Sequence, residues 1–126
     1  MVTLSITGGP TITFPWSSGM NGQTALEAAY NAQSTPKTFT FQLQYYGSSL
    51  GYLVDMINGT FDTALSTDAP YFFWDFELNG EESQYGIDST PINDGDEITF
   101  SYIMYVPETA KSRKLQAKYD AKFALN

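Results

Sequence analysis

Residues 2–33 read VTLSITGGPTITFPWSSGMNGQTALEAAYNAQ, and this stretch decides the expected fold. Apolar and polar residues alternate over residues 2–6, and the alternation resumes over residues 11–16 after the turn formers at 8–10. A period of two is typical of a strand with one buried face. The beginning of the chain therefore predicts a β-hairpin.

A short amphipathic helix is expected over residues 25–33, because Leu26, Ala29 and Tyr30 recur at helical spacing and further alanines widen the same face. Thr24 lies three residues before Glu27, the spacing of a capping box at the start of a helix. Pro36 disfavours helical backbone in the residue before it, so the helix should end shortly before Pro36.

Strands dominate the chain after this helix. The clearest one alternates Phe39, Phe41, Leu43 and Tyr45 with polar residues. The others are expected at 52–57, 72–78 and 98–104, with a loop at 60–70, a tight turn at Asn79-Gly80 and a return segment at 85–92. The order of hairpin, helix and further strands predicts an α+β chain of the β-grasp type, in which a mixed sheet packs around one helix.

Charge divides the chain into two parts. Residues 1–106 contain 12 acids and one base, Lys37, whereas residues 107–126 contain two acids and five bases. We therefore expect a β-grasp domain over 1–106 and a basic helical tail over 107–126. An acidic body repels phosphate backbones, which argues against nucleic acid as a partner. The tail could bind an acidic partner or form the solvated face of a helix.

The absence of cysteine and histidine narrows the possible chemistry. It excludes a Ser-His-Asp triad, a Cys-His pair and the common zinc sites, but not carboxylate, Lys or Tyr chemistry. No apolar run is long enough to cross a membrane, and residues 1–4 do not resemble a signal peptide. We expect no metal site, because the acids at 81–82 and 94–97 do not match an EF-hand loop and are explained by hairpin turns. Asn58 also begins a glycosylation pattern, which its turn position explains equally well.

Four landmarks resemble one family in the same order. They are Tyr46-Gly47 with GYLVDMING at 51–59, FWDFELNG at 73–80, Gly86-Ile87-Asp88, and DGDEITFSY at 94–102. Together they resemble the DUF4430 family and the related C-terminal domain of transcobalamin and intrinsic factor, over residues 22–105. The resemblance implies a β-grasp domain without enzymatic activity, and a secreted or cell-surface location as in many bacterial members.

In the vitamin carriers, a similar domain caps cobalamin bound to a helical barrel, for which this 126-residue sequence has no counterpart. A corrinoid-like ligand is therefore an expectation from the resemblance only. Carried over by position, Tyr52, Trp74, Tyr85 and Ile87 would form an apolar ledge for a flat ligand or a partner. The alternative explanation is structural: turns or close backbone approach account for Gly51, Gly59, Gly80, Gly86 and Gly95, and Trp74 belongs to the core.

Two functions follow from these patterns. The first is a non-catalytic module that holds a small molecule or a protein partner on its aromatic surface. The second is an assembly subunit that joins copies of itself through a strand edge or through the basic tail.

Overall fold

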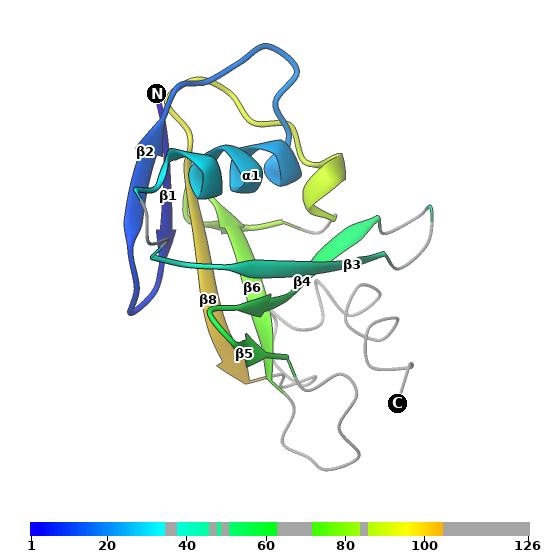
Figure 1. The fold of residues 1–126 in the computed structure, drawn as a ribbon. Coiled ribbons are helices and arrows are strands. Elements are labelled where there is room, and N and C mark those ends of the chain that lie inside the picture. Colours follow the sequence, from blue (N-terminus) through cyan, green and yellow to red (C-terminus); the bar gives the residue numbers. More distant parts are fainter. Residues whose placement is uncertain (35–37, 46–47, 49–50, 63–71, 84–85, 105–126) are drawn as a thin grey trace.

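A computed structural model of the chain describes residues 1–34, 38–45, 48, 51–62, 72–83 and 86–104. One helix packs with a mixed five-stranded sheet and a small antiparallel sheet (Figure 1), which confirms the α+β class. In chain order the elements are β1 (Val2–Ile6), β2 (Thr11–Phe14), α1 (Gly22–Ala32), β3 (Phe41–Tyr45), β4 (Tyr52–Ile57), β5 (Thr60–Phe61), β6 (Phe72–Leu78), β7 (Glu81–Glu82), the 3-10 helix η1 (Ile87–Ser89) and β8 (Glu97–Met104).

The larger sheet has the strand order β2-β1-β8-β6-β7. The expected hairpin is confirmed, because β1 and β2 pair antiparallel with Leu4 opposite Ile12. β1 also pairs in parallel with β8, which brings the two ends of the described chain together at the centre of the sheet. β6 pairs antiparallel with β8 along its whole length, from Phe72 opposite Met104 to Leu78 opposite Ile98.

The strands after residue 38 do not all join one sheet, and this differs from the expectation of a single mixed sheet. β3, β4 and β5 form a separate antiparallel sheet in that order. The reason is local: the tight turn at Asn58 and Gly59, with φ of 55° and 82°, folds β5 back on β4. The end of β4, at Met56 and Ile57, therefore has a strand on each side, β3 on one and β5 on the other.

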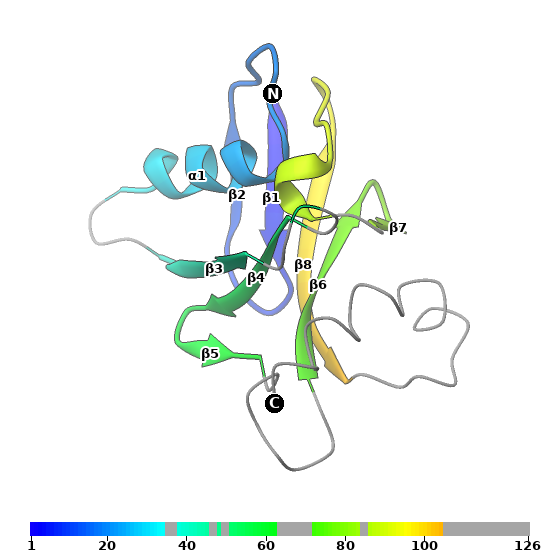
Figure 2. The same ribbon diagram turned by 90° about the vertical axis from the view of Figure 1, so that its right-hand side faces the viewer.

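The helix and the small sheet lie on the same side of the larger sheet (Figure 2). Ala25, Leu26 and Ala29 of α1 are fully buried, and the two alanines allow the helix to approach the strands closely. The core between these layers also contains Leu4, Phe14, Val54, Phe76 and Phe100. Successive side chains of a strand point to opposite faces of the sheet, so every second residue of the larger sheet contributes to this core.

The start of α1 differs from the predicted one. The helix spans Gly22–Ala32, and Asn21 rather than Thr24 is its N-cap. The Thr24 backbone N–H donates to Asn21 Oδ1 at 2.9 Å, and the Asn21 N–H donates to Thr24 Oγ1 at 2.9 Å. The capping box of Thr24 and Glu27 is therefore wrong. Asn21 already has extended backbone and a side-chain acceptor, so it caps the helix three residues earlier.

The connections contain two further corrections. The predicted loop at 60–70 begins with strand β5, and the paired return after Asn79-Gly80 is β7 rather than the segment 85–92. A two-residue turn pairs the residues that immediately follow it, which explains the early return. The segment 85–92 instead contains η1.

Two sequence predictions concern residues beyond the described ones. The helical tail at 107–126 lies outside the described residues, as does Tyr85. Among the helices that are described, none combines the length and the apolar character needed to cross a membrane.

Candidate functional site

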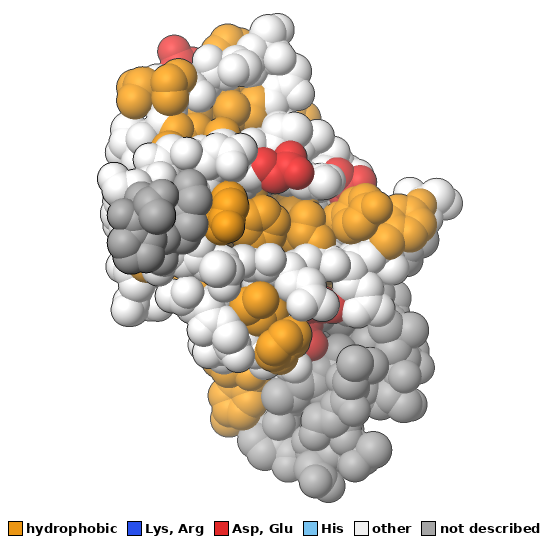
Figure 3. Space-filling model, in the orientation of Figure 1, with side chains coloured by type: hydrophobic (Ala, Val, Ile, Leu, Met, Phe, Trp, Pro, Cys, Tyr) orange, Lys and Arg blue, Asp and Glu red, His pale blue; other side chains and the backbone are white. Residues whose placement is uncertain are grey.

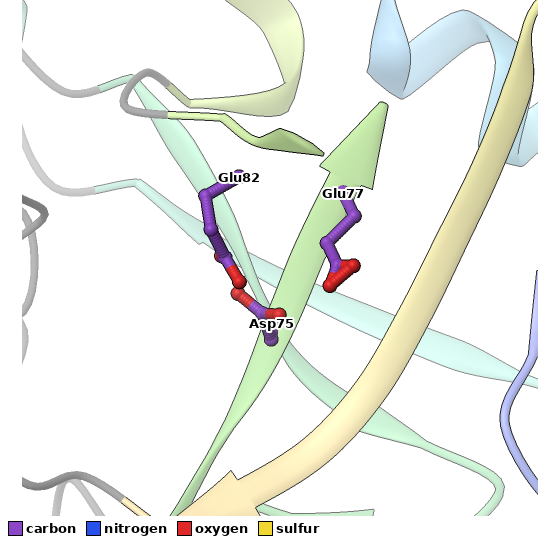
Figure 4. A group of neighbouring side chains, drawn as sticks. All are labelled: Asp75, Glu77 and Glu82. Atoms are coloured by element: carbon purple, nitrogen blue, oxygen red, sulfur yellow. The ribbon is translucent and has the colours of Figure 1, made fainter. Parts of the chain in front are cut away.

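Three carboxylates converge at the β6–β7 hairpin (Figure 4). Asp75 and Glu77 are two residues apart on β6, so their side chains leave the same face of the strand. Glu82 on β7 lies directly opposite Glu77 in the ladder. One carboxylate oxygen from each of Asp75, Glu77 and Glu82 lies within 4.8 Å of the other two.

This cluster faces away from the helix. Trp74 and Phe76, which alternate with the acids on β6, belong to the core under α1. The acids therefore belong to the opposite face of the five-stranded sheet. Asp75 is only 1% exposed, whereas Glu77 and Glu82 are half-buried. A buried acid beside two half-buried acids differs from the fully exposed acids of a solvated charged surface.

Hydroxyl groups continue this polar face across the sheet. The register places Ser101 opposite Asp75 and Thr99 opposite Glu77 on β8. Further along, hydroxyl pairs link the strands: Thr7 with Ser101 at 2.6 Å, Ser5 with Thr11 at 3.1 Å and Thr3 with Thr13 at 3.4 Å. The cluster thus has hydroxyl groups on one side, and the buried ring of Phe73 lies two residues before Asp75 on the same face of β6.

The described residues include acidic side chains but no lysine or arginine. Lys37 and the five bases of residues 107–126 all lie outside them. When ionised, two carboxylates about 5 Å apart repel by roughly 3 kcal/mol at an effective dielectric constant of about 20. Carboxylate oxygens are the ligands that hard divalent cations prefer, and a bound cation would relieve this repulsion.

The other acidic group, at residues 94–97, has a structural explanation. Asp96 accepts hydrogen bonds from the Asn93 backbone N–H at 2.7 Å and from Asn79 Nδ2 at 2.9 Å. The Asp94 carboxylate pairs with the terminal ammonium group of Met1. These acids close the turn before β8 and tie it to the Asn79 turn. This turn does not join two paired strands, because β8 pairs with β1 and β6, so the expected hairpin at 94–97 is wrong.

The ledge predicted from the sequence is mostly internal. Trp74 is 8% exposed and donates from Nε1 to the Thr60 carbonyl at 2.8 Å. Ile87 is 1% exposed and belongs to the same core. Only Tyr52 among the described members has a half-buried ring, which contacts Tyr45 at a centroid distance of 5.1 Å. The role of Tyr52, Trp74, Tyr85 and Ile87 in holding a flat ligand stays a prediction.

Tyr102 on β8 has a perturbed hydroxyl group. Its OH donates to the Phe61 carbonyl at 2.8 Å, and its ring lies 5.1 Å from that of Trp74. Burial, followed by the nearby charge of Asp62, raises the pKa of Tyr102 above its ordinary value of 10.0. The neutral hydroxyl therefore acts as a link between β8 and β5.

The sequence analysis did not predict that Asp75, Glu77 and Glu82 lie close together. The signal was present in the Asn79-Gly80 turn, where φ of 53° and 82° gives a two-residue hairpin. Such a turn pairs 78 with 81 and 77 with 82, so the approach of Glu77 and Glu82 follows from the sequence once the turn type is assigned.

The fold and the carboxylate cluster define a small α+β domain with a candidate site for a hard cation. The chain belongs to the DUF4430 family, a domain of unknown function, whose model matches residues 22–104. No curated protein was found to match the chain. A solved structure with a similar fold is that of a "putative metal binding protein" from Ruminococcus gnavus ATCC 29149. The two share 14% identity and a TM-score of 0.51, over 82% of this chain and 93% of that one.

Proposed function

We propose that this chain is a non-enzymatic binding module whose carboxylates Asp75, Glu77 and Glu82 hold a divalent cation. The observation behind this proposal is the convergence of the three side chains to within 4.8 Å. Like charges directly opposite each other in a ladder destabilise a hairpin. Glu77 and Glu82 face each other in this way, and Asp75 adds a third carboxylate beside them. A cation bound between the three would offset their mutual repulsion.

The residue types favour calcium over transition metals. The whole sequence contains no histidine and no cysteine, so nitrogen and sulfur side-chain ligands are missing from the set. Calcium takes six to eight oxygen ligands and accepts bidentate carboxylates and water, whereas magnesium demands a stricter octahedron. Three carboxylates on a hairpin, completed by water, suit the more permissive calcium ion.

Two further observations support a binding role. The strand order β2-β1-β8-β6-β7, in which β1 and β8 pair in parallel, is compatible with the β-grasp sheet expected from the resemblance to non-catalytic domains. The Ruminococcus gnavus protein of similar fold carries the description "putative metal binding protein". The composition also lacks the imidazole and thiol groups on which most nucleophilic catalysis depends.

Calorimetric titration of the purified chain with calcium tests the proposal. We expect saturable binding that Glu82→Gln and Asp75→Asn weaken at least tenfold. Glu81→Gln is the matched control, because Glu81 is the exposed neighbour of Glu82 and is not part of the cluster. No heat of binding by the unaltered chain, or equal loss in Glu81→Gln, would contradict the proposal.

A second candidate is self-association at the edge strand β3. Its sequence, Phe41-Gln42-Leu43-Gln44-Tyr45, has no charge, whereas natural edge strands are commonly protected by charged residues. Hydrophobic side chains form a band over this part of the molecule (Figure 3), and Tyr45 is 53% exposed. A second copy could add its own β3 at this edge and cover the rings of Tyr45 and Tyr52.

Sedimentation equilibrium tests this second candidate. We expect a concentration-dependent dimer that Gln44→Lys weakens, because a lysine on the edge opposes pairing. Asn31→Lys adds the same charge at an exposed position on α1 and serves as the control. A monomer at all concentrations would exclude assembly through β3.

A further inference from the structure

The sequence contains Asn-Gly at three places, Asn21-Gly22, Asn58-Gly59 and Asn79-Gly80. In such a pair the backbone nitrogen of glycine can attack the asparagine Cγ. A C–N bond forms, ammonia leaves, and water then opens the succinimide ring to aspartate or isoaspartate. We propose that Asn58 is the site of this modification in the folded chain, and that the fold protects the other two.

Asn58 has the surroundings that the reaction needs. Asn58 and Gly59 are both exposed in the turn between β4 and β5. No atom lies within 4 Å of the position that a Cβ on Gly59 would occupy, so the ring has room to form. The Asn58 side chain makes one hydrogen bond, from Nδ2 to the Thr38 carbonyl at 3.2 Å, while its backbone N–H donates to the Thr40 carbonyl at 2.9 Å. The attacking Gly59 N–H contacts Met56 Sδ at 3.0 Å, and a thioether is a weak acceptor.

Asn79 lies in a similar turn but is held from three directions. Its Nδ2 donates to Asp96 Oδ1 at 2.9 Å, and its Oδ1 accepts from the Glu97 N–H at 2.8 Å. Its backbone N–H donates to the Glu97 carbonyl at 2.7 Å. Rotation of the amide toward Gly80 requires at least the first two bonds to break, so attack at Asn79 needs an additional local opening.

Asn21 is protected by its role as the N-cap of α1. Its Oδ1 accepts from the Thr24 N–H at 2.9 Å, which holds the amide over the first turn. Gly22 is buried, and its N–H donates to the Thr90 carbonyl at 3.0 Å. The nucleophile is thus engaged and covered, and ring closure would require the start of the helix to unfold.

Modification at Asn58 has a structural consequence. Isoaspartate adds one carbon to the main chain of a two-residue turn, which shifts the register of β5 against β4. The Thr60 carbonyl on β5 accepts the Trp74 Nε1–H at 2.8 Å, so a shift of β5 changes the surroundings of the indole. Trp74 fluorescence should therefore change with the extent of modification.

Ageing of the purified full chain at mildly alkaline pH, followed by peptide mapping by mass spectrometry, tests this proposal. We expect conversion at Asn58 to be about tenfold faster than at Asn79, in line with the one additional side-chain hydrogen bond at Asn79, and faster still than at Asn21. The rate should rise with pH because the attacking nitrogen must lose its proton. Asn58→Gln should remove the fast phase, because glutamine would have to close a larger ring.

Incubation in concentrated urea is the matched control. Each asparagine precedes glycine, so the three rates should become similar once the fold is removed. Faster conversion at Asn79 or Asn21 in the folded chain, or equal rates at all three sites before unfolding, would overturn the proposal. An unchanged Asn58 in the folded chain alongside rapid conversion in urea would overturn it as well.

Discussion

The Asp88 carboxylate accepts a hydrogen bond from the Tyr52 backbone N–H at 2.8 Å, and this bond ties η1 to the first residue of β4. Gly51 precedes that residue with φ of 71°. A Cβ on Gly51 would lie 2.2 Å from Asp88 Oδ1, so a side chain and the bond cannot coexist. The small sheet is therefore attached to the rest of the domain at a position where only glycine fits.

Gly51→Ala is expected to destabilise the domain by about 3 kcal/mol, because alanine is strained at this φ and also displaces the Asp88 carboxylate. Gly59→Ala is the matched control, since it has a similar φ of 82° but open space around it. It should cost about 1–2 kcal/mol. Urea unfolding measures both values, and equal losses would refute the steric role of Asp88.

The Gln33 amide closes the connection between α1 and β3. Its Oε1 accepts from the N–H groups of Thr38 and Phe39 at 2.6 and 2.7 Å, and its Nε2 donates to the Tyr30 carbonyl at 3.1 Å. Gln33→Ala should lower the free energy of unfolding by about 2–3 kcal/mol, because it removes several partners of backbone groups at once. Asn31→Ala, at an exposed position on the same helix, should change it by less than about 0.5 kcal/mol.

The identity of the helix cap can be tested by substitution. Asn21→Ala should cost about 1 kcal/mol, because the Thr24 N–H loses its acceptor. Glu27→Ala, which removes the carboxylate that a Thr24–Glu27 capping box would need, should have almost no effect, since Glu27 is exposed and takes no part in the observed capping box. Thermal unfolding monitored by circular dichroism distinguishes these outcomes. A larger loss for Glu27→Ala than for Asn21→Ala would support the capping box of Thr24 and Glu27 instead.

Alkaline pH should weaken the fold through Tyr102. Its pKa is raised in the folded chain above the ordinary 10.0, so the neutral form is favoured there. The contribution of the Tyr102 hydroxyl to stability is therefore present in full below about pH 10, the ordinary pKa of tyrosine. It is lost as the pH rises through the raised pKa of the folded chain.

Urea unfolding across this alkaline range should show a smaller decline for Tyr102→Phe than for the unaltered chain. Asp62→Asn should lower the midpoint of Tyr102 ionisation, followed by tyrosinate absorbance, while leaving it above the ordinary value, because burial is the larger cause. An identical alkaline decline in Tyr102→Phe would contradict this assignment.

Much of the fold followed from short-range patterns in the sequence. Period-two alternation over residues 2–16 and 72–78 identified strands that the structure confirms, and the tight turn at Asn79-Gly80 is confirmed as well, although its return strand is β7 rather than the predicted segment 85–92. The assignment of strands to sheets did not follow, because alternation defines a buried face but not a neighbour. The separation of β3 and β4 from the larger sheet depends on the short strand β5, which is too brief to show a pattern.

The candidate site was harder to predict for a related reason. Asp75 and Glu77 stood in a strand assigned by its aromatic residues, and Glu82 was interpreted as part of an acidic turn. Their convergence depends on cross-strand register, which residue spacing alone does not reveal. The aromatic ledge, by contrast, was predicted from the positions of its residues in the family resemblance. The burial of Trp74 and Ile87 depends on how the helix and the small sheet pack against the larger sheet.

The most direct measurement is a crystal structure of the full chain grown with calcium, with anomalous diffraction used to locate the ion. The account predicts a peak between Asp75, Glu77 and Glu82, at about 2.3–2.6 Å from their carboxylate oxygens. A cluster without a peak, or one in which a lysine or arginine side chain occupies the centre, would contradict it.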